Sequence, residues 1–202
     1  MELLLVRHAL PVRAETVDGS PADPGLSEIG HGQAERLAAW LEGERLDAIY
    51  TSPLRRARET AAPLARARGL ATRVSPGIAE FDADASHYVP LEELKATDPE
   101  RWKALIASGF YLGGDAGVFR ETVARAVDEI VGSHPGGRVA VVCHGGVINA
   151  WVSHLLETER LFLFEPVYTS VSRFLAAASG ERSVVSLNET AHLRGAAGPP
   201  DA

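Results

Sequence analysis

Arginine and histidine side chains follow apolar runs at three separate places in the sequence. Arg7 and His8 come directly after the run "LLLV", and Arg56 lies a few residues after "LDAIYTS". His144 comes directly after "RVAVVC" and precedes two glycines. Arginines and helix N-termini bind anions, phosphate above all, and a neutral imidazole is a competent nucleophile near pH 7. These residue types therefore predict a phosphate site, provided that the fold brings the three places together.

The elements that would position these residues alternate between strand and helix. In chain order they are a strand at 3–6, a helix at 26–41, a strand at 46–51, a helix at 52–69, a strand at 71–75, a short helix at about 99–108, a helix at 118–133, a strand at 138–143, a helix at 145–157 and a closing strand pair at 169–179 and 182–189. Ser27 and Ser52 are predicted N-caps, and Gly69 is a predicted helix terminator. Because the carboxyl ends of parallel strands meet at one sheet edge, this order predicts that the three places share a site.

The remaining segments carry less pattern. Residues 77–116 form an irregular insertion with scattered aromatic side chains, which are predicted either to line the pocket or to form the core of a small helical cap. Residues 195–202 are expected to be a disordered tail. With no internal repeat and no linker, residues 1–202 are predicted to form a single α/β domain.

Composition narrows the class of protein. The chain has 202 residues, 46% hydrophobic content, one cysteine and a net charge of −7. Its apolar runs are far short of the roughly 20 residues that a membrane helix needs, and Arg7 and His8 interrupt any secretory pattern. The negative charge argues against nucleic-acid binding, and the single cysteine fits a reducing compartment. We therefore expect a cytoplasmic protein without membrane or nucleic-acid partners.

Other chemistries fit the residues less well. A nucleotide-binding P-loop is absent, and Cys143 lacks the arginine-terminated loop of a cysteine phosphatase, which predicts a buried strand residue. Two arginines in one site would repel a divalent cation, and no compact ligand spacing occurs among the residues that a metal hydrolase could recruit, which are His8, Asp82, Asp84, His87 and His144. No metal and no cofactor are expected. The structural alternative is that Arg55, Arg56 and Arg58 form a solvated helix face, with Arg55 pairing to Glu59.

Four stretches resemble the histidine phosphatase superfamily, also called phosphoglycerate mutase-like. They are "LLLVRHAL", "DPGLSEIGHGQAERLAAWL", "YTSPLRRARETAAPLA" and "VVCHGGVINAWV", in the family's order. The resemblance runs from residue 2 to about residue 157 and is weakest between 81 and 116. It implies a three-layer α/β/α fold with a mostly parallel sheet. It also favours a homodimer, although the residues themselves do not indicate the oligomeric state.

The resemblance implies a role for each matching position. His8 would be the nucleophile that forms a covalent phosphohistidine, and Glu80, in "GIAEFD", would be the proton donor. The implied phosphate ligands are the side chains of Arg7, Arg56 and His144 and the backbone N–H of Gly145. Partial burial would raise the pKa of Glu80 enough for the carboxyl group to protonate a departing alkoxide.

Departures from the family's pattern leave alternatives open. The segment after Glu80 is atypical, so Asp82 and Asp84 are rival proton donors. His192, in "LNETAHL", resembles a C-terminal family signature and is interpreted as structural, with a role in the site as the alternative. The short chain favours a metal-independent phosphomonoesterase acting on a phosphorylated small molecule. A phosphoglycerate mutase-type phosphotransferase and a non-catalytic phosphoanion-binding regulator are the alternatives.

Overall fold

A six-stranded sheet forms the centre of the computed structural model, which describes residues 1–107 and 115–194. Its strands are β1 (Glu2–Arg7), β3 (Ala48–Thr51), β4 (Thr72–Val74), β6 (Arg138–Cys143), β7 (Val171–Ala176) and β8 (Arg182–Glu189). They lie in the order β4-β3-β6-β1-β7-β8. The first four strands in this order are parallel neighbours. β7 pairs antiparallel with β1, and β8 pairs antiparallel with β7, so the predicted closing strand pair completes the sheet.

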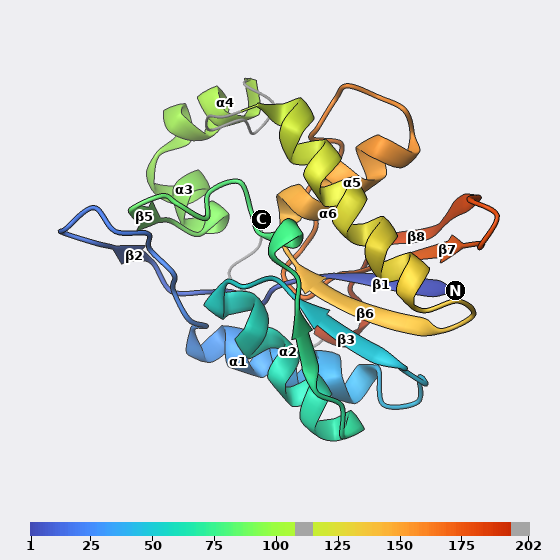
Figure 1. The fold of residues 1–202 in the computed structure, drawn as a ribbon. Coiled ribbons are helices and arrows are strands. Elements are labelled where there is room, and N and C mark those ends of the chain that lie inside the picture. The colour runs from blue at the N-terminus through green and yellow to red at the C-terminus, as the bar shows by residue number, and fades with distance from the viewer. Residues whose placement is uncertain (108–114, 195–202) are drawn as a thin grey trace.

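Helices cover both faces of this sheet (Figure 1). They are α1 (Glu28–Trp40), α2 (Arg55–Arg68), α5 (Ala116–Ser133) and α6 (Gly145–Leu155). Successive side chains of β1 point to opposite faces, as in any strand. Leu3 and Leu5 pack with α5 and α6, whereas Leu4 and Val6 pack with α1 and α2. The continuous apolar run of β1 is thus explained by burial on both faces, and the expected three-layer α/β/α fold is confirmed.

The C-terminal ends of β1, β3 and β6, which the candidate site residues follow, lie at one edge of the sheet. In β1 and β6, Arg7 is paired with Cys143, and in β3 and β6, Thr51 is paired with Val142. All three strands run in the same direction, so the residues that follow them emerge together. The edge predicted from the sequence is therefore formed as expected.

The local signals for the helices are confirmed in two cases and wrong in one. The Ser27 side chain accepts a hydrogen bond from the backbone N–H of Gly30 and caps α1, and Gly69 ends α2 in the left-handed conformation at φ +62°. The prediction that Ser52 caps α2 is wrong, because the helix begins at Arg55 after Leu54. The Ser52 hydroxyl instead lies within hydrogen-bonding distance of His144, a tertiary partner, and does not cap the helix.

The irregular segment forms a small substructure that we call the cap, residues 79–107. It contains β5 (His87–Tyr88), α3 (Leu91–Thr97) and α4 (Pro99–Ala107), and β5 pairs with β2 (Ala14–Glu15). The predicted short helix at 99–108 is confirmed as α4, but two-residue strands are too short to be predicted from periodicity. β1 runs toward the side of the molecule on which β2, β5 and α3 lie (Figure 1).

Two 3-10 turns, η1 (Pro76–Ile78) and η2 (Ala191–Leu193), complete the described elements. The predicted tail, 195–202, lies outside the described residues. None of the helices within 1–107 and 115–194 is long and apolar enough to cross a membrane.

Candidate active site

His8 lies at the end of β1 with its ring orientation defined by the backbone. Its Nδ1 lies 2.8 Å from the carbonyl oxygen of Ala9, which can only accept, so Nδ1 carries the proton and Nε2 keeps its lone pair. The backbone N–H of Ala9 donates to the Thr60 hydroxyl at 2.9 Å, and that hydroxyl donates to the carbonyl of Arg56. Thr60 of α2 thereby fixes the position of Ala9, whose carbonyl in turn orients the His8 ring. The lone pair on Nε2 is what a nucleophilic role requires.

Two arginines on the same cavity are each stacked on a tyrosine. The Arg7 guanidinium lies 3.8 Å from the ring centre of Tyr168 and donates to the carbonyl of Pro166 at 2.5 Å. Arg56, only 1% exposed, lies 4.6 Å from the ring centre of Tyr88. Stacking on an aromatic face orients a guanidinium without using its N–H donors. Both arginines therefore keep donors for a ligand.

His144 is buried beside His8, with ring centres 5.1 Å apart. Its Nε2 lies 2.7 Å from the Ser52 hydroxyl, which also accepts from the backbone N–H of Leu54. His144 lies behind the cavity rather than among its lining residues, whereas Gly145 lines it directly. Ser52 therefore sets the orientation of the His144 ring.

Each of the two arginines of the site has a buried donor that lacks a partner. Arg7 Nε and Arg56 Nε have no hydrogen-bond partner within residues 1–107 and 115–194. An unpaired buried polar group costs about 1–3 kcal/mol. An anion that accepts from such groups would remove this cost, which supports anion binding beside His8.

Burial, together with the positive charge of the two arginines, keeps both imidazoles neutral. Burial, then Arg56 and Arg7, hold the pKa of His8 well below its usual range. Burial, followed by Arg56, His8 and Arg7, does the same to the pKa of His144. A neutral His8 with a defined tautomer can attack phosphorus across the physiological pH range.

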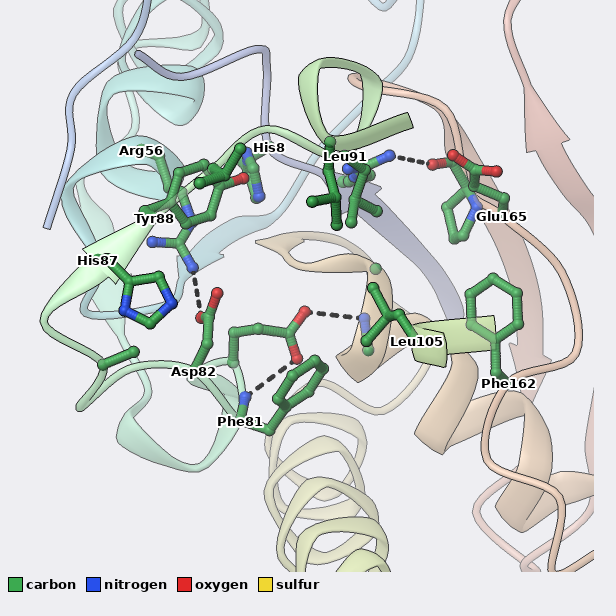
Figure 2. A pocket seen from close by; sticks show the side chains of 18 of the residues that line it. His8, Arg56, Phe81, Asp82, His87, Tyr88, Leu91, Leu105, Phe162 and Glu165 are labelled. Carbon is green, nitrogen blue, oxygen red and sulfur yellow. Dashed lines mark hydrogen bonds and ion pairs between the residues drawn. The ribbon is translucent and has the colours of Figure 1, made fainter. Parts of the chain in front are cut away.

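Glu80 faces this cluster from the start of the cap (Figure 2 draws the cavity). Its carboxylate accepts hydrogen bonds from the backbone N–H groups of Gly146, at 2.8 Å, and Phe81, at 3.1 Å. Burial, and then the negative charge of Asp82, raise the pKa of Glu80 to about 7, although those N–H groups and Arg56 act in the opposite direction. A carboxyl group with this pKa can give and take a proton near neutral pH.

Gly146 is required at its position by this contact. A Cβ atom there would lie 2.2 Å from Oε1 of Glu80. Glycine thus allows the carboxylate to reach the N-terminus of α6.

The structure separates the other candidates for the site. Asp82 lines the cavity and forms an ion pair with Arg56 at 3.0 Å, whereas Asp84 is not among the lining residues. Arg55 pairs with Glu59 at 2.6 Å on the outside of α2, as the structural alternative predicts for that arginine. Cys143 is fully buried in β6, and burial raises the pKa of its thiol, as expected for a strand residue.

His192 lies outside the cavity and contacts the back of the site. It stacks on Trp40 with ring centres 4.9 Å apart, and its Nε2 lies 3.0 Å from the Thr169 hydroxyl. The backbone N–H of Thr169 donates to the carbonyl of Arg7 at 3.1 Å. The geometry accords with the structural interpretation of His192.

The aromatic residues of the insertion divide between the two roles left open for them. Phe81 and Tyr88 line the cavity, whereas Trp102 packs against the cap's own core. Residues 108–114, which carry two further aromatic side chains, lie outside the described residues.

Sequence reasoning missed Thr60 and Tyr168 as parts of the site and interpreted Ser52 as a helix cap. Ser52 and Thr60 stand in the quoted stretch "SPLRRARET", so a signal for them was present. Tyr168 lies about 160 residues from Arg7 in the chain, and no local pattern indicates that contact. Among the described residues, no group of three or more His, Cys, Asp or Glu side chains is arranged to hold a metal ion.

The fold and the residues at its strand ends describe an α/β protein with two buried arginines beside a neutral histidine. The family model for the histidine phosphatase superfamily (branch 1) matches residues 3–190. The chain therefore belongs to the histidine phosphatase superfamily.

Several relatives are named as phosphatases. Phosphoserine phosphatase 1 of Hydrogenobacter thermophilus is 31% identical over 206 residues, covering 96% of this chain and 94% of that protein. A metal-independent phosphoserine phosphatase of Arabidopsis thaliana is 32% identical over 163 residues, covering 74% of this chain and 66% of that protein. The names of these relatives support phosphatase activity for this protein.

Solved structures share the fold. The structure of YhfR from Bacillus stearothermophilus superposes with a TM-score of 0.73 at 25% identity, covering 95% of this chain and 98% of that one. A mycobacterial glucosyl-3-phosphoglycerate phosphatase gives a TM-score of 0.72 at 23% identity, covering 94% and 99% of the two chains. The mostly parallel α/β fold is thus shared with phosphoglycerate mutase-like proteins.

Proposed function

We propose that this protein is a metal-independent phosphomonoesterase that acts through a covalent phosphohistidine on His8. The observation that carries the proposal is the hydrogen bond from His8 Nδ1 to the Ala9 carbonyl, which leaves the lone pair on Nε2. Arg7 and Arg56 supply positive charge for the phosphoryl oxygens, the part that a metal ion plays in many phosphoryl-transfer enzymes. Relatives named as phosphatases support the same class of reaction.

In the first step Nε2 of His8 attacks phosphorus. A nitrogen–phosphorus bond forms, the bond from phosphorus to the ester oxygen breaks, and Glu80 gives its proton to the departing alkoxide. Arg7, Arg56 and the backbone N–H of Gly145 hold the phosphoryl oxygens, and His144 donates once the incoming negative charge favours its protonation. Poor alcohol leaving groups make the proton from Glu80 essential.

In the second step water attacks the phosphohistidine. The Glu80 carboxylate takes a proton from that water, an oxygen–phosphorus bond forms, and the bond to Nε2 breaks. Inorganic phosphate leaves, with His8 neutral and Glu80 protonated again. A carboxyl group with a pKa of about 7 suits both halves of this cycle.

The substrate is proposed to be a phosphorylated small molecule. The cavity has a volume of about 640 Å³, which suits a metabolite-sized ligand. The names of the relatives mention phosphoserine and glucosyl-3-phosphoglycerate, and both are phosphomonoesters.

The experiment combines turnover with capture of the intermediate. Hydrolysis of 4-nitrophenyl phosphate is measured in excess chelator, and acid- and base-quenched protein is examined by intact mass spectrometry. We expect turnover in chelator and a phosphorylated protein that is labile in acid and stable in base. His8→Asn should lose both, whereas His154→Asn, on the exposed face of α6, should keep both.

Four outcomes would contradict the proposal. Activity retained by His8→Asn would remove the nucleophile, and activity restored by a divalent metal after chelation would favour metal chemistry. Release of an isomer rather than free phosphate from a phosphoglycerate would indicate a mutase. Phosphate-ester binding without turnover would indicate a regulatory protein.

A further inference from the structure

The cavity has two walls of different chemistry. The wall described above carries His8, the two arginines and the carboxyl groups. The other wall is apolar and comes from the cap and from the chain after α6: its members are Phe81, Val89, Leu91, Leu94, Leu105 and Phe162. Figure 2 shows Leu105 and Phe162 on the side of the cavity opposite Arg56 and Asp82. A bound phosphate ester would therefore point its alcohol part toward aliphatic and aromatic side chains.

This apolar wall is continuous with the core of the cap. Leu94 and Leu105 are buried, and Val89, Leu91 and Phe162 pack against them with part of their surface still accessible. Helices α3 and α4 thus turn one side of a small hydrophobic cluster toward the cavity. Partly accessible apolar side chains on a concave surface favour an apolar ligand.

The carboxylates among the described lining residues are already paired. Glu165 accepts two hydrogen bonds from Lys95, at 2.7 and 2.8 Å, and Asp82 pairs with Arg56. Glu80 accepts from two backbone N–H groups. The ammonium group of an amino acid would therefore meet carboxylates whose negative charge these donors already partly offset.

One further basic group lies at the rim of the cavity. Arg101, which is exposed, donates from Nη2 to Nε2 of the exposed His87 at 3.2 Å. Ion pairs at solvent-exposed side chains contribute little to binding, because water and salt screen them. A carboxylate on the substrate would therefore gain less at Arg101 than an apolar group gains at the inner wall.

We propose that the cavity selects phosphomonoesters of apolar alcohols, with an aromatic or branched aliphatic body, over phosphorylated amino acids and sugar acids. This inference rests on the proposed function and specifies its substrate class. Each added methylene in a hydrophobic pocket changes kcat/KM by roughly tenfold or more. A phenyl group in place of hydrogen should therefore have a large effect.

The test compares primary alkyl phosphates, so that every leaving group is an alkoxide. The panel is 2-phenylethyl phosphate, ethyl phosphate, O-phosphoserine and 3-phosphoglycerate. We expect kcat/KM for 2-phenylethyl phosphate to exceed each of the others by about tenfold or more. Equal or better turnover of O-phosphoserine or 3-phosphoglycerate would overturn the inference and leave the proposed function intact.

A variant assigns the preference to the apolar wall. Leu91→Ser, at the start of α3, should lower kcat/KM for 2-phenylethyl phosphate roughly fivefold or more and leave that for ethyl phosphate within about twofold. Val185→Ser, at an exposed position of β8, is the matched control and should change neither value. If Leu91→Ser lowers both substrates alike, the wall does not select the alcohol part.

Binding measured without turnover separates this inference from the proposed function. By calorimetry, 2-phenylethylphosphonate should bind the unmodified protein at least about tenfold more tightly than ethylphosphonate. If this preference holds while no ester is hydrolysed, the proposed function is wrong and the selectivity of the cavity stands. Equal affinities for the two phosphonates would overturn the selectivity, whatever the enzyme turns over.

Discussion

The Arg56 guanidinium and the Asp82 carboxylate form an ion pair 3.0 Å long beside the proposed nucleophile. The same carboxylate helps to raise the pKa of Glu80. Asp82 therefore contacts Arg56, which is proposed to bind the phosphate, and influences the pKa of Glu80, the proposed proton donor. Its position explains how an acidic residue can tune the site without itself transferring a proton.

Replacing Asp82 with asparagine should shift the pH dependence of activity. Glu80 must be protonated to act as an acid, so kcat/KM should fall as the pH rises through about 7. Loss of the negative charge at position 82 lowers the pKa of Glu80, because the ionised form of Glu80 is no longer repelled. The alkaline limb of the kcat/KM profile should therefore move to lower pH in Asp82→Asn.

The control for this shift is Asp84→Asn, because Asp84 does not line the cavity. Its profile should match that of the unmodified protein. If Asp82→Asn instead abolishes turnover at every pH, Asp82 itself is the proton donor.

Replacing Glu80 with glutamine should separate substrates by their leaving group. An alkyl phosphate needs a proton on its departing oxygen, and kcat for it should fall about 10²–10⁴-fold. A 4-nitrophenolate leaves without that proton, so phosphorylation of His8 by 4-nitrophenyl phosphate should slow much less. Rapid-quench kinetics on both substrates measures the difference.

Glu165→Gln is the matched variant for this experiment. Its carboxylate lies on the same cavity but is paired with Lys95. It should slow neither phosphorylation step by more than about twofold, since surface ion pairs contribute little. An equal loss on both substrates in Glu80→Gln would argue against proton donation by this residue.

Replacing Ser52 with alanine should impair the site through His144. The variant removes the hydroxyl 2.7 Å from Nε2 of His144, so the ring loses the group that orients it. We expect kcat/KM to fall about tenfold, equivalent to about 1.4 kcal/mol of transition-state stabilisation. Steady-state kinetics together with thermal unfolding checks this expectation.

Ser153→Ala provides the comparison for Ser52. Ser153, on α6, is equally buried, and its hydroxyl donates a hydrogen bond to the carbonyl of Thr158. It should show a similar loss of stability with nearly unchanged kinetics. If both variants keep full activity, Ser52 does not position His144 for the reaction.

Replacing His192 with alanine should chiefly reduce stability. The variant loses the stack on Trp40 and the contact with Thr169, and we expect a free-energy loss of about 1–2 kcal/mol, which lowers Tm by roughly 2–8 °C. Burial, then Arg36, lower the pKa of His192 to about 4. As the pH falls from 6.5 toward 4, His192 binds a proton in the unfolded chain but stays neutral in the folded chain. The free energy of unfolding that His192 contributes therefore declines over this range.

The difference in Tm between the unmodified protein and His192→Ala should therefore be largest above pH 6.5 and narrow toward pH 4. Calorimetry across this range measures it, with His31→Ala, on the exposed surface of α1, as the control. A loss of activity as complete as that of His8→Asn, with Tm unchanged, would place His192 in the reaction instead.

Much of the fold was predictable because its signals are local. The run "LLLV" is buried on both sheet faces, and Ser27 and Gly69 bound their helices through backbone geometry that nearby residues determine. The strands β2 and β5 were not predictable, because two residues show no periodicity. Ser52 was predicted wrongly because its hydroxyl finds a tertiary partner that a helix-capping rule does not include.

The sequence by itself determined which chemical groups the strand ends carry and in what order. Tertiary structure alone decided what those groups do. Neighbouring residues on a helix point about 100° apart, so α2 turns Arg56 into the cavity and leaves Arg55 outside. The pKa of Glu80 depends on burial and on Asp82, and the orientation of Arg7 depends on Tyr168, far along the chain. Such effects act through space, and only the folded chain brings their sources within reach.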